Sequence, residues 1–267
     1  MIGVLDKFGA ILRRDLLTAI RYRTGFLFRW VGMLPDVIAF YYVAHAIGPN
    51  YRPDGVQYFP FLLVGTGVFG YSLGAMSRFV ASIHDAQVGG TLELLATSST
   101  PAAVVLTLTA VSCFVEQMVN MIVYIAIGLL LFRTAIPMPN VPAAVLILLL
   151  SMAIALAFGM MAASAQVAVQ RGSWLIVMMG SFIALLTGTM FPVSALPPWV
   201  QTISRLIPFT HALTGLRLAL LNGAPIRVLA APILILAVYS LILLPASFAL
   251  FSWVLRDARR KGTLSFY

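Results

Sequence analysis

Few residues in this chain have types and spacings that could support catalysis or metal binding. The three histidines, His45, His84 and His211, are far apart and form neither an H-E-x-x-H zinc pattern nor a recognisable Ser-His-Asp set. The single cysteine, Cys113, allows neither an intrachain disulfide nor a cysteine-based metal site. No G-x-x-x-x-G-K-[ST] phosphate-binding loop occurs. We therefore expect no metal and no cofactor in this chain.

The stretch GTGVFG, residues 65–70, matches the dinucleotide-binding pattern letter by letter. That pattern functions only after a strand in a soluble βαβ unit, whereas this copy lies inside a long apolar run. Small residues in such runs let helices approach closely. We therefore expect Gly67, Gly70 and Gly74 to lie at helix–helix contacts.

Polar side chains inside apolar runs are the stronger functional candidates. Glu116, Gln117 and Asn120 interrupt one run, and Asp36 interrupts another. A carboxylate in lipid costs roughly 3 kcal/mol or more, so these groups should face other helices or water. They could line a pathway or gate, or they could pair helices structurally. Arg217 is a possible partner for Glu116.

The composition identifies the environment of these residues. The 267 residues are 61% hydrophobic and only 9% charged, with a mean hydropathy of +1.00, whereas soluble domains carry about 25% charge. Long continuous apolar runs without strand-like alternation predict an all-α integral membrane protein. The net charge of +9 could indicate nucleic acid. Because the basic residues flank the apolar runs, we expect membrane lipid as a partner and no nucleic acid.

Crossing a bilayer takes about 20 helical residues, and the apolar runs predict six transmembrane helices in a single domain, 1–267. They cover residues 26–47, 58–79, 101–132, 141–169, 174–191 and 228–255. Before them, residues 1–25 show helical amphipathicity with basic residues between the apolar ones. We expect an interfacial helix on the inner membrane surface there, with a simple topology anchor as the alternative.

One further apolar region, 194–223, is interrupted by Pro197, Pro198 and Pro208. Each piece is too short to cross. Basic residues cluster at both ends of the chain, which favours cytoplasmic termini and hence an even number of crossings. We therefore predict a re-entrant helical hairpin that enters from the outer face before the last span.

An amphipathic N-terminal helix, a short cytoplasmic helix after the second span and a broken hairpin before the last span together resemble the permease subunits of type-2 ABC exporters. GGTLELLATSSTPAAVVL, residues 89–106, is similar to that family's GTLE-x-L segment followed by proline. GTMFPVSALPPWVQTISRLIPFTHALTGLRLALLNG, residues 188–223, resembles its G-x-x-FP…LP-x-W…PxT…R region. The likeness covers nearly the whole chain.

The resemblance implies an export permease in the plasma membrane that pairs with a second permease copy or a homologue. Two copies of a separate cytoplasmic ATPase would bind the ATP and Mg²⁺, and residues 85–100 would form the coupling segment. The implied ATPase-coupling residues are Gly90, Thr91, Leu92, Glu93, Leu94, Leu95, Arg13 and Arg14. The candidate pathway or gate residues are Asp36, Glu116, Gln117, Asn120, Phe191, Pro192 and Arg217.

The substrate expected for this reading is hydrophobic or amphiphilic, such as a drug-like molecule or a lipid, with a lipid-linked polysaccharide as the alternative. A polytopic membrane enzyme should show clustered catalytic carboxylates or histidines at one membrane face, and none is apparent. An ion-coupled carrier should show broken helices in both halves, whereas only one broken region occurs. For the segment around Glu93, a helix resting on the bilayer surface remains the alternative.

Overall fold

The computed structural model describes residues 23–91, 102–134, 139–169 and 172–261. These residues form an all-helical fold without strands, as predicted. The α-helices are α2 (Arg23–Ile47), α3 (Tyr58–Val88), α5 (Ala102–Leu131), α6 (Val141–Val169), α7 (Gly172–Leu186), α8 (Pro198–Leu206), α9 (Pro208–Leu221) and α10 (Ile226–Lys261). Short 3₁₀ turns occupy Pro53–Gly55 and Val193–Ala195. The expected interfacial helix falls mostly on residues 1–22, outside the described residues.

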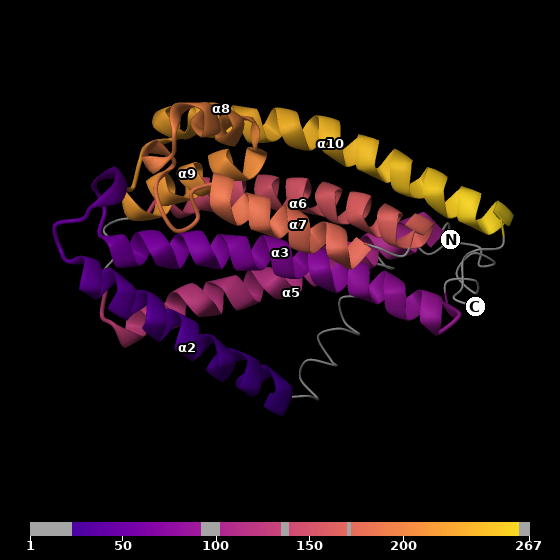
Figure 1. The fold of residues 1–267 in the computed structure, drawn as a ribbon, viewed down its shortest axis with the longest axis horizontal. Helices are drawn as coiled ribbons and strands as arrows, with labels where there is room; N and C mark the ends of the chain where they lie inside the picture. Colours follow the sequence, from indigo (N-terminus) through magenta and orange to yellow (C-terminus); the bar gives the residue numbers. More distant parts are fainter. Residues whose placement is uncertain (1–22, 92–101, 135–138, 170–171, 262–267) are drawn as a thin grey trace.

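The long helices lie side by side along an elongated bundle, with α3 in the middle (Figure 1). Of the apolar stretch of α3, 72% is buried inside the molecule, compared with 11% for α2 and 17% for α10. Helix α5 packs on α3, and α10 packs along α6. Any displacement of α3 therefore acts on the centre of the fold.

Five helices of the described chain are long and apolar enough to cross a membrane: α2, α3, α5, α6 and α10. The chain is therefore a multi-pass membrane protein. Helix α7 is apolar but has only 15 residues, so the count of six crossings stays a prediction. The predicted helix over 174–191 is wrong at its far end, because α7 ends at Leu186. Gly188 adopts a φ of +75° just beyond it, a conformation that ends helices and favours glycine.

The second predicted helix is also too short. Helix α3 continues nine residues past Phe79 to Val88, so residues 85–88 belong to it and not to a separate coupling segment. The apolar run ends earlier because Ser82, His84 and Asp85 are polar, but polar residues do not stop a helix. The helix stops at Gly89 and Gly90, where Gly90 has a φ of +66°.

The region 194–223 forms two short helices, as its prolines predict. Pro208 begins α9 directly after α8, and Ile207 between them is extended. Helix α9 is largely buried, whereas α8 exposes Trp199, Ile203 and Leu206. Both helices lie at the end of the bundle where α2 ends and α3 begins (Figure 1). Entry of this hairpin from the outer membrane face stays a prediction.

The glycines of α3 meet different neighbours. A Cβ at Gly67 would lie 3.2 Å from the Tyr124 ring, and one at Gly74 would lie 3.0 Å from the Gln117 amide. Both glycines are thus at helix contacts, as predicted. The prediction for Gly70 is wrong, because nothing lies within 4 Å of its Cβ position. The closest approach occurs at Gly65, where a Cβ would collide with the Thr189 carbonyl and the Arg217 side chain.

Gly65 and Gly70 offer a matched test on one helix. Ala is favoured over Gly in a helix by about 1 kcal/mol, so Gly70→Ala should keep or slightly raise the unfolding temperature. Gly65→Ala should lower the unfolding temperature, because overpacking reduces the free energy of unfolding by about 1–3 kcal/mol. Thermal unfolding of the detergent-solubilised variants measures both. Equal unfolding temperatures for the two variants would show that Gly65 is not a close contact.

Candidate functional site

Arg217 of α9 holds together one end of the bundle. Its Nη1 donates to the Gly188 carbonyl at 2.8 Å, and its Nη2 donates to the carbonyls of Thr189 at 2.8 Å and Phe61 at 3.1 Å. The guanidinium also lies 3.4 Å from the centre of the Phe61 ring. Only 7% of the residue is exposed. One side chain thus joins α9, the turn after α7 and the first turn of α3.

Neighbouring contacts reinforce this junction. The Tyr58 hydroxyl donates to the Met190 carbonyl at 3.0 Å, and the Thr187 and Thr189 hydroxyls lie 3.1 Å apart. Of the two predicted gate residues here, Pro192 is buried at the start of the second 3₁₀ turn and Phe191 is half-buried. They therefore flank the turn that Arg217 binds. Whether they form a gate stays a prediction.

The suggested pairing of Arg217 with Glu116 is wrong. Glu116 of α5 instead forms an ion pair with Arg78 of α3, with Nη2 and Oε2 3.2 Å apart. Arg78 lies at the end of the predicted span 58–79. Since α3 continues as a helix to Val88, Arg78 contacts the neighbouring α5 from a partly exposed position. The absence of a helix breaker before Gly89 was the available sequence signal.

Two other predicted residues lie close to this ion pair. The Asn120 amide donates to Gln117 Oε1 at 3.1 Å, and the Gln117 amide packs over Gly74 of α3. Glu116, Gln117 and Asn120 thus form, with Arg78, a polar layer between α3 and α5. Such a layer compensates a carboxylate that would otherwise be costly in lipid.

Asp36 lies apart from both groups. It is exposed on α2, and within the described part of the chain it makes no hydrogen bond or ion pair. Pro35 precedes it inside the helix. The predicted pathway residues are therefore distributed over three places: the junction at Arg217, the layer between α3 and α5, and the outer surface of α2.

The predicted coupling residues are only partly described. Gly90 and Thr91 form a compact turn on the end of α3: the Gly90 N–H donates to the Gln87 carbonyl at 3.3 Å, and the Thr91 hydroxyl donates to the Ala86 carbonyl at 3.3 Å. Residues 92–101 follow directly. Leu92, Glu93, Leu94 and Leu95, together with Arg13 and Arg14, lie outside the described residues.

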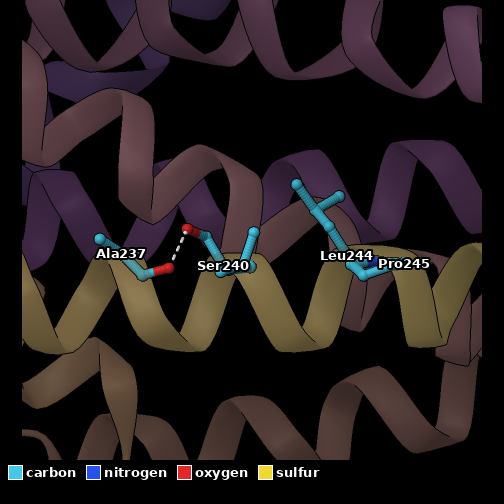
Figure 2. Close-up of a pocket in the computed structure, with 5 residues that line it drawn as sticks. Ala237, Ser240, Leu244 and Pro245 are labelled. Atoms are coloured by element: carbon cyan, nitrogen blue, oxygen red, sulfur yellow. Dashed lines mark hydrogen bonds between the residues drawn. The ribbon is translucent and has the colours of Figure 1, made fainter.

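A shallow depression on α10 is lined by Ala237, Ser240, Leu241, Leu244 and Pro245 (Figure 2). The Ser240 hydroxyl donates to the Ala237 carbonyl of its own helix at 2.9 Å, so its proton is not directed at a ligand. The other lining side chains are apolar. Among the residues with described positions, no three His, Cys, Asp or Glu side chains are grouped closely enough to hold a metal ion.

The contacts of Arg217 predict a specific stability effect. Arg217→Met should leave buried carbonyls without donors, at about 1–3 kcal/mol per lost partner. Arg217→Lys should restore only part of this stability, since a lysine ammonium cannot reproduce the planar set of N–H donors of the guanidinium. Unfolding temperatures in detergent measure the loss, and Arg205→Met, at an exposed arginine of α8, is the control. An equal effect at both arginines would contradict the junction.

The ion pair predicts non-additivity. Arg78→Gln and Glu116→Gln should each lower the thermal stability of the purified protein, because each leaves one charge uncompensated. The double variant should be more stable than the sum of the two single losses implies. Simple addition of the two losses would show that the charges do not interact.

The comparisons with known proteins agree with this architecture. A family model described as ABC-2 type transporter matches residues 6–221, which is most of the chain. No curated protein matches the chain. The match includes the polar layer, the turn after α3 and the whole Arg217 junction. This chain is therefore a member of the ABC-2 type transporter family and a transmembrane permease subunit of an ABC transporter.

Proposed function

We propose that this chain is the permease of an exporter and that a separate ATPase, present in two copies, drives it through residues 92–101. The observation that carries the proposal is the turn at Gly89–Thr91. Its hydrogen bonds attach the start of that segment to α3, the most buried of the long helices. A force applied to the segment is thereby delivered to the centre of the bundle. The ATP and Mg²⁺ are held by the partner.

Charge supports a cytoplasmic position for this segment. The last turn of α10 carries Arg259, Arg260 and Lys261, and α10 ends at the same end of the bundle as α3 (Figure 1). Basic residues next to membrane helices favour the cytoplasmic side. The proposed topology therefore has cytoplasmic termini in a plasma membrane. The Arg217 junction and the α8–α9 hairpin lie at the opposite, outer end.

The proposed substrate is a hydrophobic or amphiphilic molecule, either drug-like or a lipid, and a lipid-linked polysaccharide is the second candidate. The described helices expose many large apolar side chains, and the polar groups within the apolar runs include Asp36 and the layer around Glu116. A molecule with a long apolar part and a small polar part fits this distribution. We further propose that a second permease copy or a homologue covers the exposed side of α2.

The coupling role can be tested at the two leucines. Leu94→Asp combined with Leu95→Asp should abolish ATPase recovery during affinity purification, since apolar side chains in the proposed coupling segment suit a groove on a partner. The permease itself should still insert. Mass spectrometry of the co-purified material identifies the ATPase, and ATP-dependent movement of a fluorescent phospholipid in inverted vesicles reports transport.

The control is Val88→Asp, which adds a charge at an exposed position just before the turn. It should keep both ATPase recovery and transport. If the double leucine variant recovers as much ATPase as the wild type and transports equally well, residues 92–101 are not the coupling segment. If the wild type recovers the ATPase but does not transport the phospholipid, the substrate assignment is wrong and the coupling assignment stands.

A further inference from the structure

The side-chain amide of Gln166, near the end of α6, contacts two other helices, α7 and α3, at the proposed cytoplasmic end. Its Oε1 accepts from the backbone N–H of Gly172, the first residue of α7, at 3.0 Å. Its Nε2 donates to Gln87 Oε1 in the last turn of α3 at 3.4 Å. The same Nε2 lies 3.3 Å from His84 Nδ1, also on α3. Neither the apolar runs nor the family motifs indicated this cluster.

The orientation of this amide follows from chemistry. A backbone N–H can only donate, so the atom facing Gly172 must be the oxygen of Gln166. The NH₂ group then points toward α3, where the side-chain oxygen of Gln87, Oε1, can accept. Gly172 begins α7, and its N–H is one of those that a helix start leaves without an intrahelical partner. Gln166 therefore caps α7 through its side-chain oxygen and binds α3 through its NH₂ group.

The two glutamines of the cluster are tightly enclosed. Gln87 is 1% exposed and Gln166 is 3% exposed. A Cβ on Gly172 would lie 2.6 Å from the Ala162 carbonyl oxygen and 3.0 Å from Val80 Cγ1. The helix ends thus meet without spare space, and amides in such a site hold firmly because an unpaired buried amide is costly.

The cluster is also continuous with the proposed coupling segment. The backbone carbonyl of Gln87 accepts from Gly90 N–H in the turn, while its side chain accepts from Gln166. Helix α7, capped by Gln166, leads at its other end to Gly188 and Thr189, whose carbonyls Arg217 binds. The chain of contacts therefore runs from the coupling segment along α7 to the outer junction.

We propose that Gln166 is a positioning residue that makes α7 follow the end of α3 when the ATPase moves the coupling segment. This rests on the proposed function, because it takes the coupling segment as the place where force enters. Gln166 touches no substrate. Its role is to keep the start of α7 at a fixed place relative to α3, so that displacement at the cytoplasmic end reaches the turn bound by Arg217.

Spin-label distances in the permease–ATPase complex test this without knowledge of the substrate. In a Cys113→Ala background, one pair of labels at positions 85 and 174 joins α3 to α7, and a second pair at 85 and 259 joins α3 to α10. Asp85, Trp174 and Arg259 are all exposed. Distances are measured without nucleotide and with ATP plus vanadate. Gln166→Leu removes all three polar contacts of the amide at similar volume.

In the wild type, the 85–259 distance should change with ATP while the 85–174 distance stays constant and narrowly distributed. In Gln166→Leu, the 85–259 change should persist, but the 85–174 distance should become ATP-dependent or broaden. The matched control is Ser164→Ala, because Ser164 is equally buried on α6 but donates only to Met160 of its own helix. It should behave as the wild type.

The outcomes separate the two proposals. If the 85–174 distance in Gln166→Leu stays as constant as in the wild type, the role of Gln166 is wrong and the coupling segment is unaffected. If the wild-type 85–259 distance does not respond to ATP, the proposed coupling route fails, and the inference fails with it. Should Gln166→Leu not assemble, Gln87→Leu combined with His84→Leu removes both contacts of Gln166 with α3 and must give the same decoupling.

Discussion

The structure depends on one constraint: polar groups removed from water must find partners within the protein. Continuous helices meet it by themselves, but the turn after α7 does not. There Gly188 and Thr189 present carbonyls to a buried site, and the guanidinium of Arg217 supplies the donors. Gly65 makes this possible, because any larger residue would occupy the space that the guanidinium and the Thr189 carbonyl fill. The non-helical turn after α7 is thus stabilised by the N–H groups of one guanidinium.

Helix α7 is fastened by side-chain hydrogen bonds at both ends, through Gln166 at Gly172 and through Arg217 at the turn beyond Leu186. Along its length it lies close to α3 at Gly180, where a Cβ would be 2.8 Å from Leu73 Cδ1. Side-chain hydrogen bonds thus tie the start of α7 to α6 and the turn after it to α9. In the proposed function, these two attachment points determine what α7 transmits.

The sequence predicted the helical membrane fold well, because apolar runs and prolines act locally. The run 141–169 coincides with α6, and Pro208 marks the boundary between α8 and α9. The polar contacts were less accessible. Arg78 and Glu116 are far apart in the chain, and only the packing of α3 on α5 brings them together. Gln87 lies beyond the predicted span 58–79 and Gln166 lies inside the predicted span 141–169, and only the packing of α6 on α3 brings their side chains together.

The position of Asp36 bears on the proposed assembly. An uncompensated carboxylate facing lipid costs roughly 3 kcal/mol or more, and α2 buries little of its surface within this chain. The Glu116 carboxylate avoids that cost through Arg78, whereas no described residue does the same for Asp36. The cost disappears if water in a pathway or a polar group of a second permease copy faces this side of α2. The exposed carboxylate thus favours placing the pathway, or the partner permease, against α2 and not against α10.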